Sequence, residues 1–233
     1  MRILAVIPAR GGSKSVPRKN IAEIAGKPLI AYTVNEALKV GAITDLVVST
    51  DDDEIGAVAR SLGAQVPFMR PAELATDYAQ SGPVLKHCLL HMENLYSAVY
   101  DLVLMLQPTT PLRRALHIEK AIEMMRHDDC ESVVSVVSVK GNHPFRMKRL
   151  IGDRLINYIE QGFEDMRPRQ LLPSVYIRNG AIYLSRRDLV VKHDRIVGGN
   201  CLGFEMSPEE SINIDDILDL KLAEFLLQKH ASN

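Results

Sequence analysis

The chain has 233 residues, the size of one large α/β domain or of one domain with an inserted subdomain. Its formal net charge is −1, so no overall basic field indicates nucleic acid or an anionic membrane as a partner, and any basic site must be local. No apolar run is long enough for a membrane span or a signal-peptide core, and the three cysteines form no CxxC pair. We therefore expect a cytoplasmic protein whose cysteines are free thiols.

Strand-like and helical segments alternate through the first 139 residues. The pattern predicts buried strands at 3–8, 45–50, 65–69, 101–106 and 131–139, with helices at 28–40, 51–62, 81–95 and 115–127. The near-continuous apolar character of residues 101–106 is typical of a strand that is covered on both faces. This alternation predicts an α/β fold with a parallel or mixed sheet and right-handed crossovers.

The alternation stops between residues 140 and 172, where Arg, Lys, Pro and Gln are frequent and the apolar pieces are short. This stretch could be an inserted lobe or an arm. Strands return at 181–184 and near 200–206, and a last helix is expected over 216–229. We therefore treat residues 1–233 as one domain that carries 140–172 as an extension.

A basic, glycine-rich loop follows the first strand directly. Its segment 10–14 reads Arg-Gly-Gly-Ser-Lys, and Lys19 lies shortly after it. The glycines let backbone N–H groups approach a ligand closely, and Arg10, Lys14 and Lys19 supply positive charge, which suits a triphosphate. The spacing is neither a Walker A motif nor GxGxxG. A solvated basic turn is the alternative interpretation.

Two further strand ends carry polar residues. Ligands of open α/β sheets bind beyond the carboxyl ends of the strands, so residues 8–10 and 49–51 should face one crevice. Asp51 and its neighbours could instead only cap the following helix. Gln107, held between a strand and prolines, offers a rigid hydrogen-bonding wall, unless the segment is no more than a rigid turn.

The segment 211–216, Ser-Ile-Asn-Ile-Asp-Asp, places Asn213 and Asp215 on one face if it is extended. Two such oxygen ligands could hold Mg²⁺, which usually keeps waters and substrate phosphate oxygens as its other ligands. An aspartate that only caps the last helix is the alternative. Arg169, within a basic stretch, suits a carboxylate or a phosphate, or else belongs to a solvated basic face.

His87 and His91 have the i, i+4 spacing of metal ligands on a predicted helix. No HExxH glutamate and no third ligand accompany them, so packing on the helix is the favoured interpretation.

Taken in chain order, these motifs resemble those of the acylneuraminate cytidylyltransferases, or CMP-sialic acid synthetases, a family that includes enzymes for legionaminate and pseudaminate. The segments are ARGGSK at 9–14, PRKN at 17–20, VSTDDDEI at 48–55, RPAELATD at 70–77, LQPTTPL at 106–112, RQLLP at 169–173, RNGAIY at 178–183 and SINIDD at 211–216. Each motif is weak alone, but the series is specific and covers nearly the whole chain.

The resemblance implies a Rossmann-like nucleotidyltransferase fold with a mostly parallel sheet, a homodimer in which 140–172 reaches the neighbouring subunit, and Mg²⁺ as cofactor. CTP and a nonulosonic acid would be the ligands. The implied nucleotide-binding residues are Arg10, Gly11, Gly12, Ser13, Lys14, Lys19, Asn20, Arg70 and Ser81. The implied sugar-binding residues are Gln107, Arg169 and Asn179, and the metal would be held by Asp215 first and Asn213 second.

Two positions depart from the family pattern. Ser15 stands where the family commonly has glycine, and Asn213 stands where it commonly has aspartate. An amide offers Mg²⁺ a neutral oxygen without charge, so the ion would depend more on Asp215 and on phosphate oxygens.

The implied reaction is in-line attack by the anomeric hydroxyl of the sugar on the α-phosphorus of CTP, with pyrophosphate leaving. Arg10, Lys14 and Lys19 would neutralise the pyrophosphate, and Asp215 would hold the metal. The residues leave the general base open between a metal-bound hydroxide and a carboxylate. Three alternatives are a transferase for Kdo or a sugar 1-phosphate, a silent CTP-binding regulator, and a dinucleotide-dependent dehydrogenase. The run from His143 to Lys148 favours a legionaminate- or neuraminate-type substrate.

Overall fold

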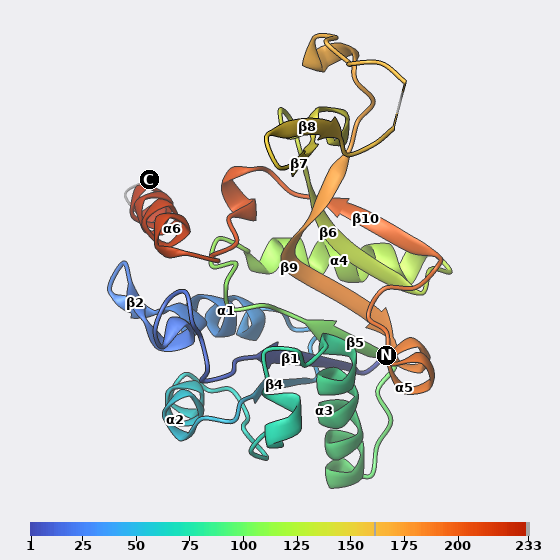
Figure 1. Ribbon diagram of the computed structural model, residues 1–233. Helices are drawn as coiled ribbons and strands as arrows, with labels where there is room; N and C mark the ends of the chain where they lie inside the picture. Colours follow the sequence, from blue (N-terminus) through green and yellow to red (C-terminus); the bar gives the residue numbers. More distant parts are fainter. Residues whose placement is uncertain (161, 232–233) are drawn as a thin grey trace.

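The computed structural model describes residues 1–160 and 162–231. At its centre lies a six-stranded sheet in the order β10-β6-β9-β5-β1-β4 (Figure 1). The strands are β1 (Ile3–Pro8), β4 (Asp45–Ser49), β5 (Leu102–Met105), β6 (Ser132–Ser138), β9 (Tyr176–Arg186) and β10 (Cys201–Glu205). β9 runs antiparallel to both of its neighbours and the other pairs are parallel, so the sheet is mixed but mostly parallel, as expected.

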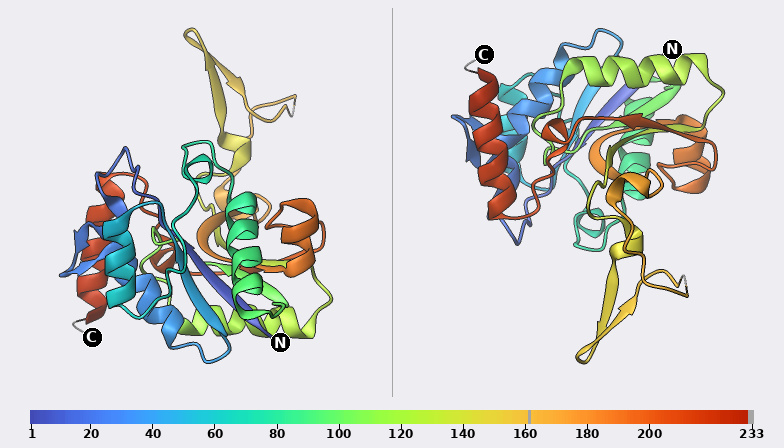
Figure 2. Two further views of the ribbon diagram at one scale, coloured as in Figure 1. Left: turned by 90° about the horizontal axis from the view of Figure 1, so that it is seen from below. Right: turned by 90° about the horizontal axis from the view of Figure 1, so that it is seen from above.

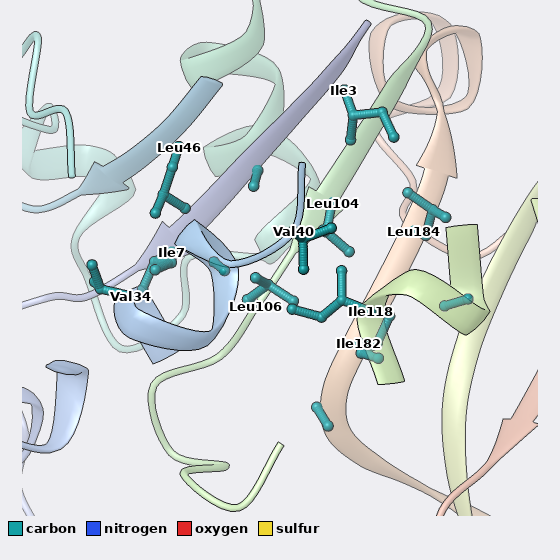
Figure 3. Packing of buried hydrophobic residues seen from close by; sticks show 14 of the residues in the cluster. Ile3, Ile7, Val34, Val40, Leu46, Leu104, Leu106, Ile118, Ile182 and Leu184 are labelled. Carbon is teal, nitrogen blue, oxygen red and sulfur yellow. The ribbon is translucent and has the colours of Figure 1, made fainter. Parts of the chain in front are cut away.

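Helices cover both faces of this sheet, because alternate strand residues point to opposite sides. On one side, Ile3, Ala5 and Ile7 pack with α1 (Leu29–Leu38), α2 (Asp53–Ser61) and α4 (Ala115–His127) (Figure 3). On the other, Leu4 and Val6 pack with α3 (Ser81–Tyr96) and α5 (Arg187–His193). β5, which lies in the one segment predicted to be covered on both faces, is therefore buried as expected.

The last helix, α6 (Ile217–Ala231), packs outside this core. Its Ala223 joins a small cluster with Ile24, Leu29 and Ile214. Ile24 belongs to a short hairpin of β2 (Glu23–Ile24) and β3 (Lys27–Pro28), which follows the basic loop. This cluster brings the C-terminal part of the chain beside the N-terminal loop.

Residues 140–172 include a hairpin of β7 (Lys148–Ile151) and β8 (Arg154–Asn157), which projects away from the body of the molecule (Figure 2). Short 3-10 helices flank it, η3 (Pro144–Arg146) before and η4 (Arg169–Leu171) after. At its base, His143 Nε2 and the carbonyl oxygen of Pro173 lie 3.1 Å apart. We call residues 140–172 the arm.

Most predicted elements are confirmed, and the differences have local causes. Residues 65–69 form no strand but a single bridge from Gln65 to Val47, because Pro67 cannot donate to a ladder. β9 begins at Tyr176, five residues before the predicted strand at 181–184. α5 was not predicted from the sequence.

The structure also describes the three thiols, the lengths of the helices and the surroundings of His87 and His91. Cys88, Cys130 and Cys201 are free thiols. Across the described residues, no helix combines the length and the apolar character that crossing a membrane requires. His87 and His91 both lie against the ring of Phe68, and no cluster of three metal-ligating side chains occurs in residues 1–160 and 162–231.

Candidate active site

A pocket of about 320 Å³ lies beyond the carboxyl ends of β1 and β5, where ligands of open α/β sheets bind. It draws its walls from four distant parts of the chain: the basic loop, the segment around Arg70, the start of α3 and the turn after β5. Its lining includes Arg10, Ser13, Lys19, Asn20, Arg70, Asp77, Ser81, Met105, Gln107 and Thr109. Seven residues predicted for nucleotide or sugar therefore share one cavity.

The basic loop is held open by contacts with the end of β4. The backbone N–H of Gly11 donates to Asp51 Oδ1 at 3.0 Å, and a Cβ at Gly11 would lie 2.7 Å from Asp52 Oδ2. Asn20 Nδ2 donates to the carbonyl of Arg10 at 2.9 Å. Gly11 is thus required by close packing, and its N–H is used by the protein itself.

Asp51 and Asp52 have different roles after β4: Asp51 contacts the basic loop, and Asp52 caps α2. Asp52 is the N-cap of α2 and accepts from the backbone N–H groups of Glu54 and Ile55, each at 3.0 Å. Arg18 donates to Asp52, and this hydrogen bond lowers the pKa of the Asp52 carboxyl. Asp51 shapes the loop rather than capping the helix.

Two cations of the loop meet on one carboxylate. Arg10 Nη2 lies 2.8 Å from Asp77 Oδ1, and Lys14 Nζ contacts Asp77 Oδ2. The hydrogen bond from Lys14, together with Arg10, lowers the pKa of the Asp77 carboxyl. Lys14 itself is 82% exposed, so water screens its ion pair with Asp77.

Lys19 and Ser15 join the loop to the segment that carries Asp215. Lys19 is buried, and its Nζ donates to the carbonyl oxygens of Ile214 at 2.8 Å and Asp215 at 3.2 Å. Ser15 Oγ donates to the same Asp215 carbonyl. Ser15, the first departure from the family pattern, therefore joins the basic loop to the segment that carries Asp215.

Asn213 and Asp215 lie side by side, as the alternation predicts. Asn213 Nδ2 donates to Asp215 Oδ2 at 3.1 Å, and Thr109 Oγ1 donates to Asn213 Oδ1 at 2.6 Å. A hydroxyl can also accept, so the amide could turn over and present its oxygen beside the carboxylate. The donor set is then one carboxylate and one amide oxygen, which fits Mg²⁺ when phosphate and water supply the remaining ligands.

Asp216, and not Asp215, makes the N-terminal cap of α6. Asp216 Oδ1 accepts from the N–H groups of Leu218 at 2.8 Å and Asp219 at 3.0 Å. Asp219 Oδ2 accepts in return from the N–H groups of Asp216 and Asp215. Asp216 therefore caps the helix, and the neighbouring Asp215 is left for the predicted metal site.

Arg70 forms part of the pocket wall from a buried position. Its Nε donates to Ser49 Oγ at 3.0 Å, and its Nη2 donates to the Ser49 carbonyl. Burial lowers the pKa of its guanidinium. Ser81 stands at the first residue of α3, where free N–H groups favour polar or negative ligand atoms.

Gln107 follows β5, and its side-chain oxygen lies against Gly180. A Cβ at Gly180 would come within 2.5 Å of Gln107 Oε1, and Gly180 has a φ of +82°. Asn179, by contrast, is buried: its Oδ1 accepts from Ser135 Oγ at 2.6 Å, and its Nδ2 donates to Ser211 Oγ at 2.9 Å. Asn179 is thus held beside the register shift in the pairing of β9 with β6 and is not among the residues that line the pocket.

Arg169 lies apart from the other predicted sugar residues. It lines a second hollow of about 320 Å³ at the base of the arm, together with Lys140 and His143. Gln107 and Arg169 therefore do not line the same cavity within one chain.

Two pocket residues were missed by sequence reasoning. Asp77 belongs to the quoted RPAELATD motif but received no role, and Thr109 belongs to LQPTTPL. A carboxylate between two cations depends on the folding of an irregular segment, so no periodicity could have indicated it. A hydroxyl two residues after the predicted wall residue Gln107 was a signal that could have been used.

A mostly parallel sheet with a basic loop and a buried arginine at its strand ends defines a nucleotide-binding α/β protein. Comparison with known proteins narrows this class. Residues 4–195 match the family model described as "Cytidylyltransferase", and the chain belongs to that family.

Similar proteins support the assignment over nearly the full length. The chain is 36% identical over 232 residues to the CMP-N,N'-diacetyllegionaminic acid synthase of Legionella pneumophila, covering 98% of this chain and 97% of that one. It is 34% identical over 230 residues to the N-acylneuraminate cytidylyltransferase of Escherichia coli O18:K1:H7, covering 98% of this chain and 52% of that protein.

The fold has a counterpart among solved structures. CMP:2-keto-3-deoxy-manno-octonic acid synthetase complexed with CTP superposes with a TM-score of 0.71 at 20% identity, covering 99% of this chain and 100% of the other. At this identity the likeness establishes the shared nucleotidyltransferase fold.

Proposed function

We propose that this cytidylyltransferase transfers CMP from CTP to the anomeric hydroxyl of a nonulosonic acid of the N-acylneuraminate or legionaminate type, with release of pyrophosphate. The observation that carries the proposal is the single pocket that collects Arg10, Lys19, Arg70, Ser81 and Gln107 beyond the strand ends. The names of the Legionella and Escherichia relatives supply the class of sugar.

The pocket's chemistry suits this transfer. Arg10 and Lys14 lie where they would neutralise the β- and γ-phosphates, and Lys19, anchored on two backbone carbonyls, keeps a third N–H for a phosphate oxygen. No covalent enzyme intermediate is needed, so the residues act by positioning and by charge stabilisation. Arg70 and Ser81 would orient the cytidine so that the α-phosphorus of CTP faces the sugar.

Mg²⁺ would be held by Asp215 and Asn213, and when bound it supplies positive charge to the phosphate oxygens. The ties from Ser15 and Lys19 fix the Asp215 backbone against the loop, so the carboxylate and the phosphate-binding cations keep a constant spacing.

The sugar side of the proposal involves a homodimer in the cytoplasm. Gln107 and Arg169 line different hollows of one chain, and the arm projects from the body. We propose that the arm of one subunit reaches the other, so that Arg169 meets the sugar carboxylate beside the partner subunit's pocket. Free cysteines agree with a reducing compartment.

The test is CTP with a panel of acids: N-acetylneuraminate, N,N'-diacetyllegionaminate, pseudaminate and Kdo, with sugar 1-phosphates beside them. Pyrophosphate release and the mass of the CMP-sugar are measured. We expect release with one or more of the first three acids. Release only with Kdo or a sugar 1-phosphate overturns the sugar class, and CTP binding without release with any acceptor identifies a regulator.

A further inference from the structure

We propose that Asp77 is an internal competitor for the phosphate site: its carboxylate occupies Arg10 and Lys14 in the free enzyme, yields to the triphosphate, and returns to help pyrophosphate leave. This inference rests on the proposed function, because it needs the phosphates of CTP at these two cations.

The contacts of Asp77 are those a phosphate would make. One carboxylate oxygen lies 2.8 Å from Arg10 Nη2, and the other contacts Lys14 Nζ. Arginine and lysine bind a carboxylate and a phosphate through the same N–H groups, so both anions cannot hold these donors fully at once. Asp77 also lines the pocket, so the competition takes place within the site.

The segment 71–80, which we call the strap, is anchored at both ends. At one end, the backbone N–H of Arg70 donates to the carbonyl of Thr50 at 2.7 Å. At the other, Gly82 lies so close to the Asp194 carbonyl that a Cβ would stand 1.9 Å from its oxygen. Asp77 sits between these anchors and joins the strap to the basic loop.

The ion pairs of Asp77 are weak enough for a triphosphate to displace the carboxylate. The Asp77 and Arg10 side chains are each 34% exposed, and Lys14 is 82% exposed, so water screens both pairs. Pyrophosphate carries more negative charge than one carboxylate and displaces it. Asp77 nevertheless weakens the binding of every ligand at Arg10 and Lys14, because its own ion pairs with these two side chains must first be broken.

The experiment compares Asp77→Asn with Glu73→Gln. Both substitutions remove one negative charge from the strap, but only Asp77 contacts Arg10 and Lys14. Inorganic pyrophosphate is titrated into each full-length protein by calorimetry without added metal. We expect Asp77→Asn to bind pyrophosphate roughly two- to thirtyfold tighter, the range for two exposed ion pairs, and Glu73→Gln to match the parent.

The kinetic counterpart is product inhibition. Pyrophosphate should inhibit CTP turnover by Asp77→Asn at correspondingly lower concentration, with a lower KM for CTP. Weaker pyrophosphate binding by Asp77→Asn would mean that Asp77 orients the two cations, and equal tightening in Glu73→Gln would mean a general charge effect; either result overturns the inference. Thermal unfolding of both variants checks that the fold is kept.

The failure of the proposed function has a separate signature. Lys14→Ala and Arg10→Ala should each weaken pyrophosphate binding. If both leave it unchanged, the phosphate site itself is misplaced and both proposals fall. If they weaken it but Asp77→Asn does not tighten it, only the competitor role is overturned.

Discussion

Gly180 lies beside the side-chain oxygen of Gln107 and has a backbone φ of +82°, a conformation that favours glycine. A methyl group there would stand 2.5 Å from Gln107 Oε1 and push that side chain out of place. We expect Gly180→Ala to raise the KM for the sugar acid about tenfold or more, with a smaller effect on the KM for CTP. Steady-state kinetics with each substrate varied separately measures the difference.

Gly26 provides the matched control. It has a similar φ of +77°, but a Cβ there meets nothing within 4 Å. Gly26→Ala therefore carries the same backbone strain without the contact. If it raises the sugar KM as much as Gly180→Ala does, strain and not the position of Gln107 explains the effect.

Asn213 limits the negative charge of the segment 213–215, for which we propose a role in metal binding. In Asn213→Asp, a second carboxylate would stand beside Asp215, where Asn213 Nδ2 is now 3.1 Å from Asp215 Oδ2. Like charges at this spacing repel unless a cation lies between them. We expect Mn²⁺, titrated into the protein alone and followed by electron paramagnetic resonance, to bind about tenfold tighter.

The control for this change is Asn213→Ala, which removes the amide without adding charge and should not strengthen Mn²⁺ binding. Unchanged affinity in Asn213→Asp would show that the ion does not approach this pair.

At the scale of residues, the sequence predicts those pocket residues whose polar or charged side chains come directly after a strand. Arg10 and Gln107, each expected at a strand exit, line one cavity because parallel strands end on the same edge of a sheet, whereas residues 49–51, expected to face the crevice with 8–10, do not line it. Asp77 was missed because the strap has no periodicity that fixes its path. Arg169 lies elsewhere because its position depends on the arm, whose direction no local pattern determines.

At the scale of elements, strong apolar periodicity gave accurate boundaries. α4 spans Ala115–His127, as predicted, and β5 spans Leu102–Met105 within the predicted strand. The failures lie where tertiary contacts override local pattern. β9 extends back to Tyr176 through a polar stretch, because its partner β6 offers a ladder there. α5 has only seven residues, which is too short for a helical apolar periodicity to be recognised in the sequence.

Substitutions at Asp216 and Asp215 test helix capping and the proposed metal binding separately. Asp216 accepts from two N–H groups of the first turn, so Asp216→Ala should lower the free energy of unfolding by about 1 kcal/mol. Asp215→Ala should leave that free energy nearly unchanged but abolish Mg²⁺-dependent turnover. Urea unfolding and pyrophosphate release measure the two effects.

The reverse pattern would contradict this division. If Asp215→Ala unfolds more easily than Asp216→Ala and keeps its turnover, Asp215 is structural and the metal assignment is wrong. A parallel loss of stability and turnover in Asp216→Ala alone would indicate that the cap also positions the segment 213–215.

At the scale of the whole molecule, the arm carries apolar side chains that the body does not cover. Leu150 of β7 and Leu155 of β8 are paired across the hairpin, and each is 70% exposed. An apolar pair presented on a projecting hairpin is typical of a surface that another chain covers. We propose that this pair lies in the homodimer interface.

Replacing this pair tests both the dimer and the supply of Arg169 across it. We expect Leu150→Glu combined with Leu155→Glu to give a monomer by sedimentation, because two charges would be buried without partners. Sugar turnover should fall at least tenfold while pyrophosphate binding, which uses Arg10 and Lys14 of the same chain, is retained. Leu95→Glu, at a 53% exposed leucine of α3, is the control and should keep the parent's mass and turnover. A double variant that remains dimeric would place the interface elsewhere, and a monomer with full turnover would show that each pocket is complete within its own chain.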